Sequence, residues 1–154
     1  MSHVTDGQLR IRDLDALDEV LAERFPHLEL RRGKRTFGWW GAFVGDSTPP
    51  PGRDPKDYGK CEHAIGRKGY PGRNGASGEY EIGLVPALDG EGFDTLLDTY
   101  GPGRTLAAEL PALRREYAAK IATKKATERL SRYGWRIQRE DLPAGRIRLR
   151  LRKR

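Results

Sequence analysis

The residues best suited to chemistry are arginines near the end of the chain. Between Gly145 and Arg154, charged and aliphatic residues alternate in the order Arg146, Ile147, Arg148, Leu149, Arg150, Leu151 and Arg152. In a β-strand, a period of two places the guanidinium groups on one face and the aliphatic side chains on the other. A guanidinium donates paired hydrogen bonds to phosphate, so the pattern predicts a polyanion-binding surface. The alternative is a solvated edge strand whose charges prevent aggregation.

Neighbouring segments are expected to position and extend this surface. Residues 135–139 read as a strand, and Leu142-Pro143-Ala144-Gly145 reads as the turn of a β-hairpin. The arginine-rich segment is then the second strand of that hairpin. The predicted patch also takes in arginines of the first strand and lysines of the preceding helix: Arg136, Arg139, Lys120 and Lys124.

The distribution of charge supports a polyanionic partner. Residues 114–154 hold 15 Lys or Arg and 4 Asp or Glu, whereas residues 1–113 hold 14 and 18, and the whole chain has a net charge of +7. Such a chain favours nucleic acid or an acidic protein face as partner. The acidic first part and the basic last part would also permit head-to-tail self-association, so a homo-oligomer is left open.

A second basic segment follows a predicted strand. Ile65-Gly66-Arg67-Lys68-Gly69 resembles the I-G-x-x-G loop by which KH domains hold a nucleic-acid backbone. The next residues, Tyr70-Pro71-Gly72, do not permit the helix that this module requires. We therefore expect a flexible basic loop, with Arg67 and Lys68 as candidate phosphate contacts.

Aromatic and apolar residues offer candidate protein interfaces. Phe37, Trp39 and Phe43 fit one face of a strand and Trp40 the other. Core packing explains them, although an exposed Trp40 would stack on a base or anchor a partner. On the long helix, one face carries the further interface candidates Leu110, Leu113 and Tyr117.

Catalytic and metal-binding patterns are weak. Cys61 and His63 form one Cys-x-His pair, well below the four ligands of a structural zinc site, so we expect a strand cysteine and a hydrogen-bonded histidine. No Ser-His-Asp arrangement, paired carboxylates or Walker loop stands out. We therefore expect no enzyme, no metal and no cofactor.

The elements predict an α+β fold in a single domain over residues 1–154. Most of the sheet is expected to be antiparallel, with two principal helices and a C-terminal hairpin. Predicted strands are 9–12, 28–31, 36–44, 60–66, 79–85, 135–139 and the arginine segment. Predicted helices are 14–24, capped by Asp13, and 105–133, with a short helical turn around Phe93, Leu96 and Leu97. Residues 45–59 and 66–78 read as loop insertions.

Several short motifs together resemble the family called domain of unknown function 1257. They are Met1-Ser2-His3 with residues 11–17, Tyr80-Glu81-Ile82-Gly83-Leu84, Asp98, residues 113–120, Tyr133-Gly134-Trp135 and residues 145–149. The family includes a conserved reading frame of algal plastids and cyanobacteria, with bacterial and phage-associated relatives. It has no established catalytic residues. Its members are often encoded near AAA-type ATPases, and the resemblance thus implies an accessory or partner-binding role.

Together these observations predict a non-enzymatic basic module whose C-terminal arginine hairpin binds a polyanion, RNA or DNA backbone. The alternative is a small adaptor or structural subunit of an assembly, associated with an AAA-type ATPase or with phage. No apolar run of membrane-spanning length and no leader pattern is found, and a single cysteine suits a reducing compartment. We therefore expect a cytoplasmic protein without a membrane partner.

Overall fold

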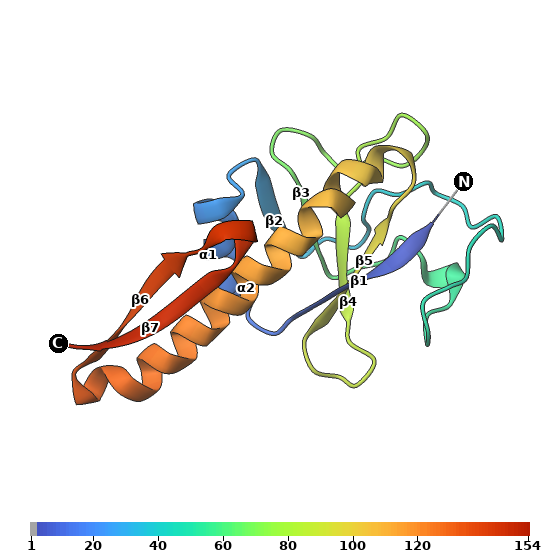
Figure 1. Cartoon of the computed structure of the whole chain (residues 1–154). Coiled ribbons are helices and arrows are strands. Elements are labelled where there is room, and N and C mark those ends of the chain that lie inside the picture. Colours follow the sequence, from blue (N-terminus) through green and yellow to red (C-terminus); the bar gives the residue numbers. More distant parts are fainter. Residues whose placement is uncertain (1–2) are drawn as a thin grey trace. The chain divides into compact units, whose positions relative to one another are not determined.

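The computed structural model describes residues 3–154 and has an α+β fold, as predicted. It contains two α-helices, a five-stranded sheet and a two-stranded hairpin (Figure 1). The chain divides into two compact units, one ending at Leu110 and the other spanning Pro111–Arg154. The sequence predicted one domain, and each unit is described below by itself.

The first unit is built on an antiparallel sheet with the strand order β1-β5-β4-β3-β2. The strands are β1 (Val4–Ile11), β2 (Leu28–Arg32), β3 (His63–Arg67), β4 (Ile82–Pro86) and β5 (Phe93–Asp98). The first two strands are joined by a helix, as the sequence predicts, but they form the two opposite edges of the sheet. The central strands are therefore supplied by the middle of the chain.

The helix α1 (Leu14–Arg24) begins where the sequence predicts. The Asp13 side chain accepts a hydrogen bond from the Ala16 amide at 2.9 Å, which satisfies one of the free amides of the first turn. Its buried stripe joins the core of the unit through Ala16, Leu17, Val20 and Leu21. The amide of Phe25 donates to the Leu21 carbonyl and ends the helix before Pro26.

Residues 36–44 do not form the predicted strand. Only Thr36 makes a β-bridge, to Lys60, and the following backbone groups bond to separate loops. Gly41 has a φ of +104°, which an extended strand does not allow. Phe37 and Trp39 are nevertheless buried in the core, as predicted for these aromatic residues.

Residues 93–98 form β5 rather than the predicted helical turn. This strand lies between β1 and β4 and is buried on both faces, so Leu96 and Leu97 are adjacent and both inside. A strand of this kind lacks the alternation by which strands are recognised in a sequence. The predicted strands 60–66 and 79–85 correspond to β3 and β4, with shifted ends.

The two predicted insertions are irregular for most of their length. Residues 45–59 contain only the single-turn helix η1 (Pro55–Asp57), and Arg53 ties this loop to Asp94 of β5 at 2.7 Å. The glycine-rich loop begins after Arg67, where β3 ends. It lies against a buried carboxylate, because a Cβ at Gly72 would come within 1.7 Å of a carboxylate oxygen of Glu81.

The long helix α2 (Arg104–Leu130) follows the short turn η2 (Gly101–Gly103) and is close to its predicted length. Its first turns belong to the first unit, with Leu106 and Leu110 buried. The unit boundary falls at Pro111, which lies inside the helix and removes one backbone hydrogen bond. Helix η3 (Ser131–Tyr133) and Gly134, with a φ of +79°, end this segment, as the sequence predicts for Gly134.

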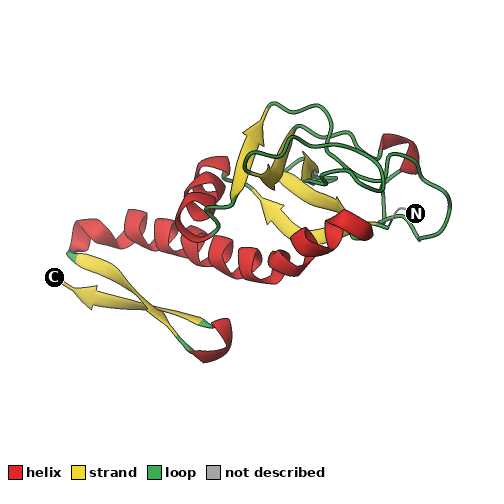
Figure 2. Cartoon of the chain, turned by 90° about the horizontal axis from the view of Figure 1, so that it is seen from above, coloured by secondary structure: helices red, strands yellow, loops and turns green. Residues whose placement is uncertain are grey.

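The second unit ends in the predicted hairpin. Strands β6 (Trp135–Asp141) and β7 (Ile147–Lys153) are antiparallel and are joined by a turn that contains η4 (Pro143–Gly145). Ala144 and Gly145 both have positive φ values, which reverse the chain. Figure 2 shows the hairpin running beside the last turns of α2.

Candidate nucleic-acid interface

The register of the hairpin sorts its side chains onto two faces. Trp135 pairs with Lys153, Arg136 with Arg152, and the pairing continues in step to Asp141 and Ile147. Directly paired residues point to the same side of an antiparallel pair. We call one side the arginine face, which consists of Arg136, Gln138, Glu140, Arg148, Arg150 and Arg152.

The arginines of this face are exposed and closely spaced. Arg136, Arg148, Arg150 and Arg152 all lie at the surface. Successive arginines of β7 are two residues apart, which corresponds to roughly 6.8 Å along the strand. Arg136 faces Arg152 across the pair, where Cβ atoms lie about 5 Å apart. Four guanidinium groups therefore share a small area from which they can reach neighbouring phosphates.

Charge on the arginine face is uneven. Near the turn, the Glu140 carboxylate forms ion pairs with Arg148 at 3.6 Å and Arg150 at 3.0 Å. At the other end, Arg136 and Arg152 are directly opposed, and neither has an ion pair within residues 3–154. Like charges directly opposed across a strand pair repel. The open end of the hairpin therefore carries the least compensated positive charge.

Arg139 lies on the other side of the hairpin. It makes two hydrogen bonds to the Glu116 carboxylate, at 2.7 and 2.8 Å, and two to Asp141, at 2.8 and 3.1 Å. The bonds to Glu116, followed by those to Asp141, raise the pKa of the guanidinium. The predicted patch groups Arg139 with Arg136, whereas residues three apart on a strand face opposite ways. Arg139 fastens β6 to α2 instead.

The remaining basic candidates of the second unit lie outside the arginine face. Arg146 precedes β7, and its Nε donates to the Pro143 carbonyl at 3.3 Å within the turn. Lys120 and Lys124 are half-buried on α2. The structure therefore brings together four of the eight basic residues proposed for this part of the chain.

Arg67 and Lys68 belong to the first unit. Arg67 pairs with Glu79 at 3.1 Å and lies over the ring of Tyr70, with the guanidinium carbon 4.8 Å from the ring centroid. Lys68 is exposed, and its backbone amide donates to the His27 carbonyl. No helix follows, so the loop lacks the geometry of the KH module, as predicted.

Two features of the hairpin region were missed by sequence reasoning. The counter-charge Glu140 could have been found by stepping two residues at a time from Arg136, which leads to Gln138 and Glu140. Tyr133 is the last residue of the helix predicted over residues 105–133, and 61 % of its surface is exposed. Its position directly before the helix-ending Gly134 was the available signal, since the chain leaves the helix there.

Most of the residues predicted to contact a partner protein are buried within the fold. Leu110, Leu113 and Tyr117 are buried, which leaves them little area for a partner. Trp40 is partly buried against the aromatic core, its amide donates to Asp98 at 3.1 Å, and its ring meets Tyr100 edge to face. Asp98 is itself buried and accepts from backbone amides, which is a structural role.

Cys61, His63 and a cavity beside Arg53 are further features of the first unit. Burial raises the pKa of the Cys61 thiol to about 11, so the thiol is protonated at neutral pH. The Nδ1 atom of His63 accepts from the Gly33 amide at 3.0 Å. A cavity of about 440 Å³ lies between the 52–62 segment and Leu88 and Leu96, and its arginine, Arg53, is engaged with Asp94.

Within residues 3–154, His, Cys, Asp and Glu residues form no cluster of three or more that could hold a metal ion. Neither helix in the same range has the length and apolar character needed to cross a membrane.

Comparison of the chain with protein-family models, with curated proteins and with solved structures gave no match. The resemblance to the domain of unknown function 1257 family therefore stays a prediction. Function must be argued from the geometry of the site alone.

Proposed function

We propose that this protein is a non-enzymatic binding module whose arginine face holds a nucleic-acid backbone. The observation that carries the proposal is the strand register, which gathers Arg136, Arg148, Arg150 and Arg152 on one exposed face with a single carboxylate. Guanidinium groups bind phosphate oxygens in pairs, so this arrangement suits a chain of phosphates better than a single anion.

Edge protection is the competing explanation for the arginines. Both strands of a two-stranded sheet are edges, and charges placed along each of them suffice to prevent aggregation. They do not require an arginine of β6 to stand directly opposite an arginine of β7, because such a pair destabilises the hairpin. A phosphate between the two guanidinium groups would turn this repulsion into attraction. The opposed pair therefore favours an anionic ligand.

Binding of this kind is electrostatic and largely independent of base sequence, because phosphate contacts position a protein without specifying bases. Each neutralised phosphate releases condensed counterions. Four contacts predict a slope of log affinity against log salt of roughly −3.6 for duplex DNA and about −2.8 for a single strand.

The test is fluorescence anisotropy with labelled RNA and DNA oligonucleotides from low to moderate salt. A variant with Arg136, Arg148, Arg150 and Arg152 changed to Thr keeps the preference for strands while removing the guanidinium groups. The charge-matched control changes four exposed basic residues of the first unit to Thr: Arg35, Lys56, Lys60 and Arg104.

We expect salt-dependent binding by the unmodified protein and by the control. For the arginine-face variant, affinity should fall and the slope should approach zero. Equal losses in both variants would show that net charge, rather than the arginine face, drives binding. An absence of binding at low salt would overturn the proposal and leave the arginine face as edge protection or as a surface for an assembly partner.

A further inference from the structure

An exposed aromatic ring stands at the open end of the hairpin. Tyr133 is 61 % exposed, although a tyrosine ring usually buries much of its apolar area. Its backbone is held in place, because the Gly134 amide donates to the Ser131 carbonyl at 3.0 Å. The Gly134 carbonyl in turn accepts from the Arg154 amide at 2.7 Å. The exposed ring is thus attached to a fixed turn.

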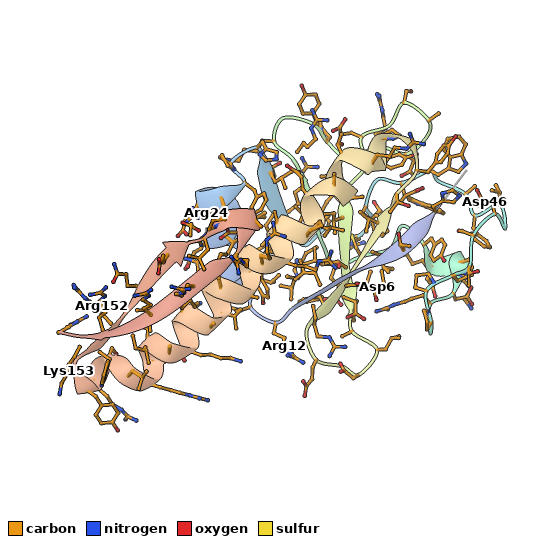
Figure 3. All side chains as sticks on the ribbon, viewed as in Figure 1. Asp6, Arg12, Arg24, Asp46, Arg152 and Lys153 are labelled. Atoms are coloured by element: carbon orange, nitrogen blue, oxygen red, sulfur yellow. The ribbon has the colours of Figure 1, made fainter. Side chains whose placement is uncertain are left out.

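The same end of the hairpin holds the uncompensated charge. The first two strand pairs after Tyr133 are Trp135 with Lys153 and Arg136 with Arg152. Figure 3 labels Arg152 and Lys153 at the end of β7 that is remote from the turn. The nearest carboxylate of the arginine face, Glu140, is engaged near the turn with Arg148 and Arg150.

Arg132 adds a planar cation to this arrangement. Its guanidinium carbon lies 5.1 Å from the centroid of the Tyr133 ring, a cation–π contact. An arginine stacked on one side of a ring leaves the other side for a second flat group. A nucleobase is such a group, and the phosphates on either side of it would meet Arg136 and Arg152.

A positively charged track beside an exposed aromatic ring is the combination by which proteins hold unpaired nucleotides. Bases inside a duplex are already stacked on their neighbours and do not present a free face. Phosphate contacts alone would not distinguish a single strand from a duplex in this way. The ring therefore adds a preference that the arginine face by itself lacks.

We propose that the second unit binds single-stranded nucleic acid, with an unpaired base stacked on Tyr133 and the adjoining phosphates on Arg136 and Arg152. This inference rests on the proposed function and narrows its ligand to strands with unpaired bases.

The experiment compares three labelled probes of equal length: single-stranded RNA, single-stranded DNA and duplex DNA. The variants are Tyr133→Ala, which removes the ring, and Tyr133→Phe, which keeps it. Tyr70→Ala is the matched control, because Tyr70 is also exposed, at 52 %, and also carries an arginine over its ring, but belongs to the first unit. Circular dichroism checks that each variant is folded.

We expect Tyr133→Ala to weaken binding to single strands by about 5- to 150-fold, the loss measured when one base loses its aromatic platform. Duplex affinity should stay within twofold, and Tyr133→Phe and Tyr70→Ala should resemble the unmodified protein. The salt slope should not change, because stacking releases no counterions. An equal loss of affinity for single-stranded RNA and DNA supports the proposal, with stacking that does not depend on the sugar. A loss for only one of the two also supports the proposal and identifies that nucleic acid as the ligand.

Three results would overturn this inference. An unchanged single-strand affinity in Tyr133→Ala, or an equal loss of affinity for single strands and duplex, would leave the proposed function intact. A larger effect of Tyr70→Ala than of Tyr133→Ala would also overturn it. By contrast, salt-independent binding or no binding to any probe would be a failure of the proposed function itself.

Discussion

Arginines of the first unit and arginines of the hairpin have different neighbours. In the first unit, several arginines pair with separate carboxylates: Arg10 with Asp89, Arg31 with Glu81, Arg32 with Asp15, Arg53 with Asp94 and Arg67 with Glu79. On the arginine face, four arginines stand beside one carboxylate, Glu140, which pairs with Arg148 and Arg150 only. The same residue type therefore holds loops together in one unit and is left available to a ligand in the other.

Arg31 shows what a fully engaged arginine does. It pairs with Glu81 at 2.8 Å and also donates to the carbonyls of Arg67 and Tyr70 at 2.7 and 2.9 Å. These bonds fasten the start of the glycine-rich loop to β2. Most donors of this guanidinium are engaged within the unit. The number of arginines in a segment therefore says less about binding than the number of nearby carboxylates.

The largest effect is expected when a paired arginine of the first unit loses its partner. Glu81 is 1 % exposed and also accepts from Lys34 and from the Gly38 amide. Glu81→Gln would leave Arg31 and Lys34 without this counter-charge, and we expect the first unit to lose about 3 kcal/mol of unfolding free energy. Denaturant unfolding followed by tryptophan fluorescence measures this loss; Trp135→Phe in both proteins removes the signal of the second unit.

The control is Glu79→Gln, which removes a more exposed carboxylate two residues away that pairs with Arg67. A surface ion pair of this kind contributes about 0–1 kcal/mol. Equal losses of unfolding free energy in the two variants would show that burial of Glu81 does not strengthen its ion pairs. The contrast between engaged arginines in the first unit and available arginines on the arginine face would then be weaker.

A smaller effect is expected for the paired arginine inside the second unit. Arg139 is 26 % exposed and makes two hydrogen bonds to Glu116. Arg139→Thr should cost the hairpin about 1–2 kcal/mol, which corresponds to a 5- to 30-fold faster amide hydrogen exchange in β6 and β7. Arg136→Thr is the matched control on the same strand, and it should not accelerate exchange. If both variants accelerate exchange alike, the two faces of the hairpin contribute equally to its stability, and the expected difference is absent.

The smallest effect has the opposite sign. Arg152→Thr removes the repulsion between Arg152 and Arg136, so the hairpin should gain about 0.2–1 kcal/mol at low salt. Exchange in β6 and β7 should slow by up to about fivefold, and the difference should shrink in added salt because the repulsion is screened. Binding to single strands should weaken in the same variant. A hairpin that is less stable at every salt concentration would contradict the assigned register.

Sequence reasoning predicted the hairpin well, because the residues that determine it lie close together in the sequence. Alternation of arginine and aliphatic residues, a Pro-Ala-Gly turn and a glycine at the helix end are all visible within about 20 residues. The same period of two also predicts the face of the hairpin to which Arg139 belongs. Its bond to Glu116 could not be predicted from this period, because it joins residues 23 apart in the chain.

The first unit was harder to predict, because residues that contact one another in its fold are far apart in the sequence. β5 pairs along one edge with β1, more than 80 residues earlier in the chain, as the pair Ile11 and Phe93 shows. Residues 36–44 have the composition of a strand, but the amides of Phe37 and Trp39 donate to the Gly59 carbonyl and the Asn74 side chain. The Trp39 carbonyl accepts from the Gly75 amide. Propensity alone does not reveal such partners.

The turn between β6 and β7 determines more than the reversal of the chain. Because side chains alternate along a strand, inserting or deleting one residue in the turn would slip the pairing and carry Arg148, Arg150 and Arg152 to the side of Arg139. A change of two residues would preserve the faces. The parity of the turn length therefore decides which face carries the charge: even changes of length retain the arginine face, whereas odd ones abolish it.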